Sequence, residues 1–214
     1  MQHSKSEFSR WDAAQTLINK YIRQNVESVQ QGKEMALPSA LLEVLAAILV
    51  DQKLDKSLIA EILRIPSETS MAELFDAIDI DAIHQVKHFI EKTIATQLHD
   101  LFIDVYQQSK TKHYDLNQKD IAKRDLVSVC LYYIGLNGNE SDQLLIANHF
   151  NNADNMTDVL AAMQAAKQGQ LPVLDKMMNT FEAKWSHDGL VMDNWFRLQA
   201  SSPAEGCLNT VKSL

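Results

Sequence analysis

The sequence predicts an all-α protein built as an irregular superhelical stack of antiparallel helix pairs. Three observations carry this prediction. Of the 214 residues only six are Gly and four are Pro, so the residues that form turns and break helices are scarce. Hydrophobic residues make up 46% and charged residues 22%, the balance of a folded globular chain. Most of the chain also carries apolar residues at the three- and four-residue steps of an amphipathic helix.

The first part of the chain shows this spacing in several segments. Apolar residues recur along one stripe from 8 to 29, and Gly32 ends that helix. Pro38 stands at the first turn of the next helix, a position that tolerates proline. The run LLEVLAAILV that follows is apolar nearly all round, which predicts a buried central helix. Two short helices are expected at 57–64 and 70–77.

The longest periodic segment runs from Asp81 to about Gln108. Its apolar stripe continues over about seven turns with no Gly or Pro, so one unbroken helix is expected. The polar stretch 109–118 that follows is the best internal boundary. It divides the single domain, 1–214, into the subdomains 1–108 and 119–214.

The second part of the chain predicts more compact helices, separated by turn-forming residues. Two successive helices take up about 33 residues, close to the period of paired-helix solenoids. The tetratricopeptide consensus is absent and no residue-level repeat is visible, so an irregular stack of HEAT or armadillo type is expected. The predicted helices are 118–135, 140–150, 156–167, 172–186 and 189–200, with a last one starting at Pro203.

Charge, hydropathy and cysteine content limit the partners and the cellular location that the sequence predicts. The formal net charge of −8 disfavours nonspecific binding to nucleic acid. No run reaches 18 apolar residues and the N-terminal residues lack an apolar leader core, so no membrane association and a cytoplasmic location are expected. Cys130 lies in an apolar run and is expected to be a buried, reduced thiol.

The segment His84-Gln85-Val86-Lys87-His88 places two histidines four residues apart, the spacing of a zinc peptidase helix. Gln85 stands where such a peptidase has its glutamate, and a glutamine cannot accept a proton from zinc-bound water. No third ligand is evident. Two partly exposed helix histidines are therefore the preferred interpretation. Motifs of nucleophilic hydrolases, phosphate-binding loops and dinucleotide-binding folds are also absent, so no catalytic and no metal-binding residue is assigned.

Two segments are specific enough to be candidate cavity or interface positions. In NNADNMTD, Asn155 is expected to cap a helix, Thr157 lies in its first turn and Asp158 stands at its third position. In GLVMDNWF, Asp193 and Trp195 lie on a helix that carries large apolar residues all round. A well-capped turn and ordinary core packing are the alternatives, and both are favoured over direct ligand contact.

Taken together, these segments resemble the C-terminal helical domain of the bacterial aminopeptidase N family, which are zinc-dependent alanyl aminopeptidases. The resemblance covers essentially the whole chain, in the family's order. The matching stretches are FSRWDAAQ (8–15), ALPSALLEVLAAILVDQKLD (36–55), MAELFDAIDIDAIH (71–84), TIATQL (93–98), NNADNMTD (151–158) and GLVMDNWFRLQASSP (189–203).

The resemblance implies that this chain is part of a larger peptidase. The family's H-E-x-x-H zinc helix and G-A-M-E-N motif belong to a preceding catalytic domain, and neither occurs here. It implies zinc in the parent enzyme, no cofactor in this part, and peptides and the catalytic domain as partners. The implied role is to cover the catalytic domain and restrict peptide access. A free-standing helical-repeat interaction module is the alternative, and self-association through exposed apolar residues near 190–214 is also expected.

Overall fold

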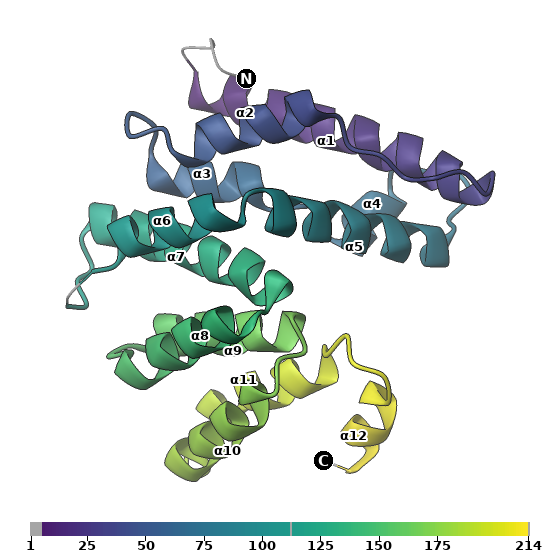
Figure 1. Ribbon diagram of the computed structural model, residues 1–214. Coiled ribbons are helices and arrows are strands. Elements are labelled where there is room, and N and C mark those ends of the chain that lie inside the picture. The colour runs from purple at the N-terminus through teal and green to yellow at the C-terminus, as the bar shows by residue number, and fades with distance from the viewer. Residues whose placement is uncertain (1–5, 112, 214) are drawn as a thin grey trace.

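The computed structural model describes residues 6–111 and 113–213, and these form twelve helices and no strand. The helices stack from the N-terminal to the C-terminal end of the molecule (Figure 1). This confirms the all-α prediction. The helices are α1 (Glu7–Gln30), α2 (Ser39–Leu49), α3 (Lys56–Leu63), α4 (Glu68–Ala72), α5 (Ile80–Gln97), α6 (His99–Ser109), α7 (Gln118–Asn137), α8 (Glu140–Asn152), α9 (Met156–Gln168), α10 (Val173–Trp185), α11 (Gly189–Ala200) and α12 (Cys207–Ser213).

The helix expected over 81–108 is in fact two helices, α5 and α6, which meet at Leu98. Its φ of −111° and ψ of 16° lie outside the helical region, although the sequence there has no Gly or Pro. His99 begins α6, and its Nε2 lies 2.8 Å from Oδ1 of the buried Asp142. This contact holds the start of α6 against α8. Leu98 stays buried, so the apolar stripe continues across the break. The sequence therefore gives no sign that the helix is interrupted there.

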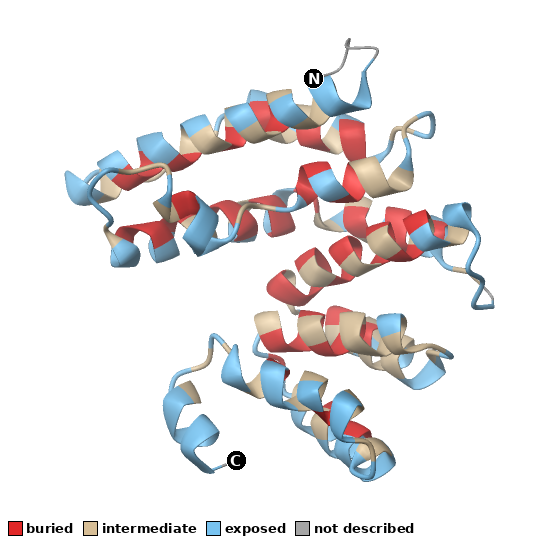
Figure 2. Ribbon diagram, turned by 180° about the vertical axis from the view of Figure 1, so that it is seen from behind, coloured by how far each residue is buried: buried red, intermediate tan, exposed pale blue. Residues whose placement is uncertain are grey.

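The central helix of the molecule is α7, and the prediction that the LLEVLAAILV run would be central is wrong. α2 buries one stripe and packs mainly against α3 and α6, because it lies in the N-terminal layer with neighbours on one side. α7 packs against α3, α5, α6, α8 and α9. Figure 2 shows how the buried residues gather on these middle helices. The eleven buried residues of α7 are Ala122, Arg124, Leu126, Val127, Val129, Cys130, Leu131, Tyr133, Ile134, Gly135 and Leu136.

Two glycines allow α7 and α9 to pack very closely. A Cβ atom added at Gly135 would overlap the backbone carbonyl of Ala165, and one at Gly169 would overlap the carbonyl of Gly135. Backbone atoms cannot rotate away as a flexible side chain can, so these two positions require glycine. The crossing fixes the end of α7 against the end of α9.

The other helices follow the predicted boundaries to within a few residues, with two exceptions. The helix expected at 70–77 is the shorter α4, Glu68–Ala72, and the last helix begins at Cys207, not at Pro203. Cys130 is buried and free, as predicted. α7 packs against helices on the other side of the proposed 109–118 boundary. Among residues 6–111 and 113–213, no helix is both long and apolar enough to cross a membrane.

Candidate functional site

A groove lies between α5 and the C-terminal part of the chain. Its volume is about 1030 Å³. One wall is the exposed face of α5, and the other wall includes Gln168, Gln170, Pro203 and Glu205. Figure 1 shows α5 and α12 on the same side of the molecule. The groove is therefore assembled from segments that are more than a hundred residues apart at its extremes.

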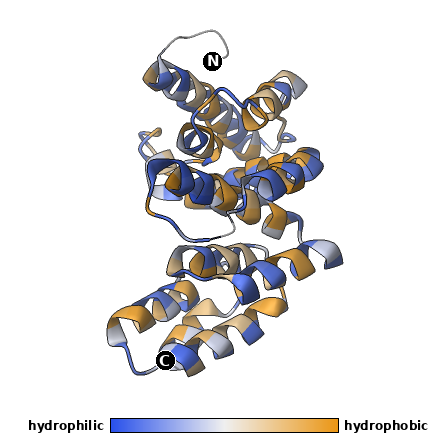
Figure 3. Ribbon diagram, turned by 90° about the vertical axis from the view of Figure 1, so that its left-hand side faces the viewer, coloured by the Kyte–Doolittle hydropathy of each residue, from blue (hydrophilic) through white to orange (hydrophobic). Residues whose placement is uncertain are grey.

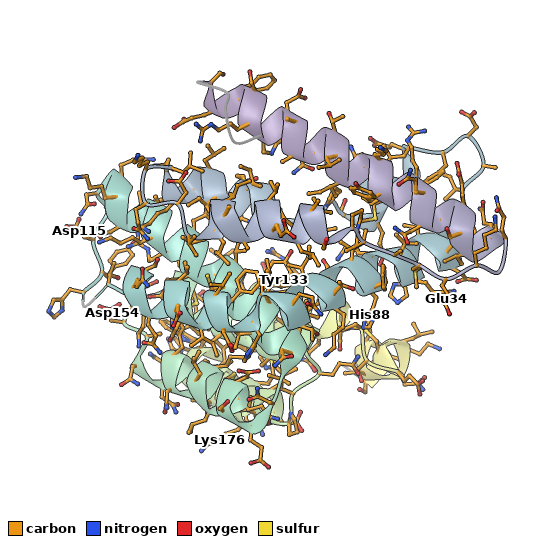
Figure 4. All side chains as sticks on the ribbon, turned by 45° about the horizontal axis from the view of Figure 1, so that its top comes forward. Glu34, His88, Asp115, Tyr133, Asp154 and Lys176 are labelled. Carbon is orange, nitrogen blue, oxygen red and sulfur yellow. The ribbon has the colours of Figure 1, made fainter. Side chains whose placement is uncertain are left out.

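A second hollow, of about 460 Å³, continues this groove toward α7. Lys87, Glu91 and Gln168 line both hollows, which makes them one continuous surface. Tyr133, labelled in Figure 4, is buried and lines the second hollow. Much of the lining is uncharged and polar, with glutamine and threonine side chains that can donate or accept hydrogen bonds.

The junction of the two hollows contains a buried carboxylate. Glu91 is only 4% exposed. It accepts hydrogen bonds from Lys87 Nζ at 2.5 Å and from the Tyr132 hydroxyl at 2.9 Å. Burial, and then the negative charge of Glu91, raise the pKa of Tyr132, so the hydroxyl keeps its proton and acts as the donor. Because a buried charge is costly without a partner, this network fixes the wall of the groove.

The two histidines of the HQVKH segment also line the groove, on the exposed side of α5. His84 Nδ1 lies 2.8 Å from Glu68 Oε1, and His88, labelled in Figure 4, lines the groove together with Pro203 and Glu205. Within the part of the chain that the structure describes, no group of three or more His, Cys, Asp and Glu side chains could hold a metal ion. With Gln85 in the place of a general base, these residues do not fit a catalytic zinc centre.

Asn155 caps α9, as the sequence predicts. Its Oδ1 accepts a hydrogen bond from the backbone N–H of Asp158 at 3.0 Å, and its Nδ2 donates to Asp158 Oδ2 at 2.8 Å. Thr157 is exposed on the first turn. Asp158 lines a separate small cavity of about 180 Å³, together with His149 of α8. This pair does not touch the groove.

Asp193 and Trp195 lie on α11, away from the groove. Asp193 is exposed, and Trp195 is half-buried with its Nε1 donating to the Met178 carbonyl at 3.2 Å. Trp195 lines another hollow, of about 480 Å³, formed by α10, α11 and the start of α12. The structure thus places the five candidate residues in two separate groups. Their role as cavity or interface positions stays a prediction.

The groove residues Lys87, Glu91 and Tyr132 were not among the candidates. One signal was present in the sequence, because Glu91 stands three residues before the apolar Ile94, on the same helix face, and a carboxylate on a buried stripe needs a partner. Lys87 stands four residues earlier, at the spacing of a helical ion pair. The partner from α7 and the far wall could not be found this way, since nothing local relates those segments to α5.

Two proteins of known name are similar to this chain in sequence over its full length. Aminopeptidase N of Escherichia coli strain K12 is 44% identical over 214 residues, and that of Haemophilus influenzae is 38% identical over the same length. These alignments cover all of this chain but only 25% and 24% of the two relatives, so the chain spans about a quarter of their length.

A solved structure shares the fold. The crystal structure of Legionella pneumophila aminopeptidase A in complex with aspartic acid matches with a TM-score of 0.83 and 24% identity, over 99% of this chain and 26% of that one. The family model described as a domain of unknown function (DUF3458_C) with ARM repeats matches residues 1–214. The HEAT- or armadillo-like stack predicted from the sequence is thereby confirmed. The chain belongs to this family of ARM-repeat domains.

Proposed function

We propose that this chain is the C-terminal helical domain of a zinc-dependent aminopeptidase, and that it covers the catalytic domain and restricts which peptides reach it. The observation that carries the proposal is the 44% identity to aminopeptidase N over the full length of this chain. The zinc and the catalytic residues would belong to another domain. The partners proposed here are that domain and the peptide substrates.

The groove supports the proposed access role. A hollow of about 1030 Å³ is at the upper end of the range for ligand sites, large enough for an extended peptide segment. Its glutamine and threonine side chains can pair with peptide main-chain groups whatever the peptide sequence. Such a surface, placed over a catalytic centre, would admit a peptide terminus and exclude a folded protein.

A bulky substitution in the groove of the full-length enzyme tests this role. Thr96 is exposed and lines the groove, so Thr96→Trp narrows the proposed passage. We expect kcat/KM for a long peptide to fall about tenfold, which corresponds to about 1.4 kcal/mol, while turnover of a small alanyl chromogenic substrate is nearly unchanged.

Thr180→Trp is the matched control. Thr180 is exposed on α10 and lines none of the hollows described above, so this variant should leave both substrates unaffected. An equal loss for both substrates with Thr96→Trp, or no loss for either, would contradict the access role. The 214-residue chain by itself is expected to bind no stoichiometric zinc and to hydrolyse neither substrate.

A further inference from the structure

A small polar cavity lies at the end of the molecule opposite the groove, where α6, α7, α8 and α9 meet. Its volume is about 180 Å³. Three buried side-chain atoms that line it have no hydrogen-bond partner among the described residues: Ser109 Oγ, His149 Nε2 and Asp158 Oδ1. The His149 side chain is only 8% exposed. Figure 4 labels Asp154, another lining residue, at this end.

Unpartnered buried polar atoms are costly, and native proteins satisfy nearly all of them. Only one further buried side-chain atom in the described part of the chain lacks a partner, the Nε2 of Gln199. The convergence of the other three on one cavity therefore indicates that the cavity binds something. The chemistry of the occupant follows from the proton on His149.

The neighbours of His149 determine where that proton lies. The Tyr106 hydroxyl is 3.0 Å from His149 Nδ1, its one hydrogen-bond partner in the described chain. Burial, and then the charge of Asp158, raise the pKa of Tyr106 to about 12, so the hydroxyl keeps its proton and can donate it. The carboxylate of Asp158 lies 3.9 Å from Nε2 and favours the proton of neutral His149 on that nitrogen, which leaves Nδ1 bare to accept from Tyr106.

The Nε2–H group lies 3.9 Å from Asp158 Oδ1, too far for a direct hydrogen bond. An occupant between them must accept a hydrogen bond from Nε2–H and donate one to the carboxylate. A metal ion cannot accept the N–H, and an anion cannot donate to Asp158. Water does both, and Ser109 supplies a third partner, which is the usual number for a buried water.

We propose that this cavity is a water-binding site that joins α6, α8 and α9 through the chain Tyr106–His149–water–Asp158, and that protonation of His149 weakens this chain and destabilises the fold. Protonated His149 carries hydrogen on both ring nitrogens, so the Tyr106 hydroxyl loses its acceptor. The Nε2–H group still reaches the water, but the unpaired Tyr106 O–H and the buried positive charge of His149 now oppose the folded state.

The charges around His149 set the direction of the pH response. Asp158 of α9 favours its protonated form, whereas Lys110 at the end of α6 opposes it, and Arg124 of α7 and Asp154 also line the cavity. Burial is the largest influence, and it lowers the pKa of His149 below the ordinary value of 6.5. As pH falls below about 6.5 the unfolded chain takes up a proton that the folded chain does not, so stability is lost toward acid pH.

Nuclear magnetic resonance of the 214-residue chain with ¹⁵N-labelled histidine tests the site without any mutation. At neutral pH we expect His149 to be protonated on Nε2 and bare on Nδ1, with magnetisation transfer from Nε2–H to a long-lived bound water. A proton on Nδ1, or an Nε2–H with no contact to water, would overturn the proposal.

Urea unfolding between pH 7.5 and pH 5 tests the switch. The wild-type unfolding constant should rise by up to about tenfold per pH unit below 6.5 relative to that of His149→Gln. His88→Gln, which removes an exposed histidine of α5, should follow the wild type. Parallel pH profiles for wild type and His149→Gln would show that His149 is no switch. If His149→Gln does not fold, the wild-type histidine titration decides, because a His149 pKa at or above that of His88 contradicts the proposal.

Discussion

The middle helices and the C-terminal helices of this chain are held very differently. Helices α5, α7 and α9 bury seven, eleven and five residues, and α7 packs against both of the others. By contrast, α10 buries Met177 and Phe181, α11 buries Met192 and Leu198, and α12 buries nothing. A layer inside a repeat stack is stabilised by two neighbours, and a layer at its edge by one.

This difference matters for the groove, because the middle helices supply the α5 wall and the end of α9, whereas the C-terminal region supplies the rest of the opposite wall. α5 belongs to the well-packed middle, whereas Pro203 and Glu205 connect the weakly buried α11 and α12. Segments with few buried apolar contacts open locally at a small free-energy cost. We therefore expect a groove with a firm wall at α5 and an opposite wall that can move at Pro203 and Glu205.

The largest expected effect compares a phenylalanine from each region. Phe102 is fully buried and stacks on Tyr133, with ring centroids 4.6 Å apart. Phe102→Ala should lower the free energy of unfolding by about 4 kcal/mol, because it leaves a cavity in the core. Phe196 is 43% exposed, so Phe196→Ala should cost less than about 1 kcal/mol. Urea denaturation measures the loss in free energy of unfolding for both variants. Equal losses would contradict the difference between the two regions.

A glycine pair gives a second comparison. Gly135→Ala forces a Cβ into the backbone of α9 and should destabilise the chain by about 3 kcal/mol. Gly189, at the start of α11, has open space around its Cβ position, so Gly189→Ala should be neutral or stabilise by about 0.5 kcal/mol. For each variant, thermal and chemical denaturation should give a change in stability of the same sign. A tolerated Gly135→Ala would mean that α7 and α9 do not cross closely.

The smallest expected effect is weak self-association through the C-terminal region. Leu190, Phe196, Leu208 and Val211 are exposed on α11 and α12, and Figure 3 shows hydrophobic stretches along the helices nearest the C-terminus. Exposed apolar patches commonly bind a partner. Sedimentation should show association that increases with concentration and that Leu190→Ser with Leu208→Ser reduces. A strict monomer at all concentrations would count against this.

The sequence predicted what depends on local periodicity and capping. It located most helices, the Asn155 cap and the buried Cys130, because apolar spacing and side-chain caps act within a few residues. It missed the break at Leu98, where the next residue, His99, contacts the distant Asp142. It also placed the LLEVLAAILV run at the centre, because apolar content alone does not reveal how many neighbours a helix has.

The groove could not be predicted from the sequence, because it also depends on contacts between distant segments. Its walls come from α5, from the end of α9 and from the connection before α12, and only the fold brings them together. The exclusion of the HQVKH segment as a zinc centre, in contrast, required only the identity of Gln85.

Native-state hydrogen exchange tests the central claim, that the groove has one firm and one movable wall, most directly. Amides in α5, α7 and α9 should exchange only through global unfolding, with one shared free energy. Those in α10 to α12 should exchange through local opening, at a free energy several kcal/mol lower. A single free energy for all of these helices would contradict the account, because it would mean that both walls of the groove are equally fixed.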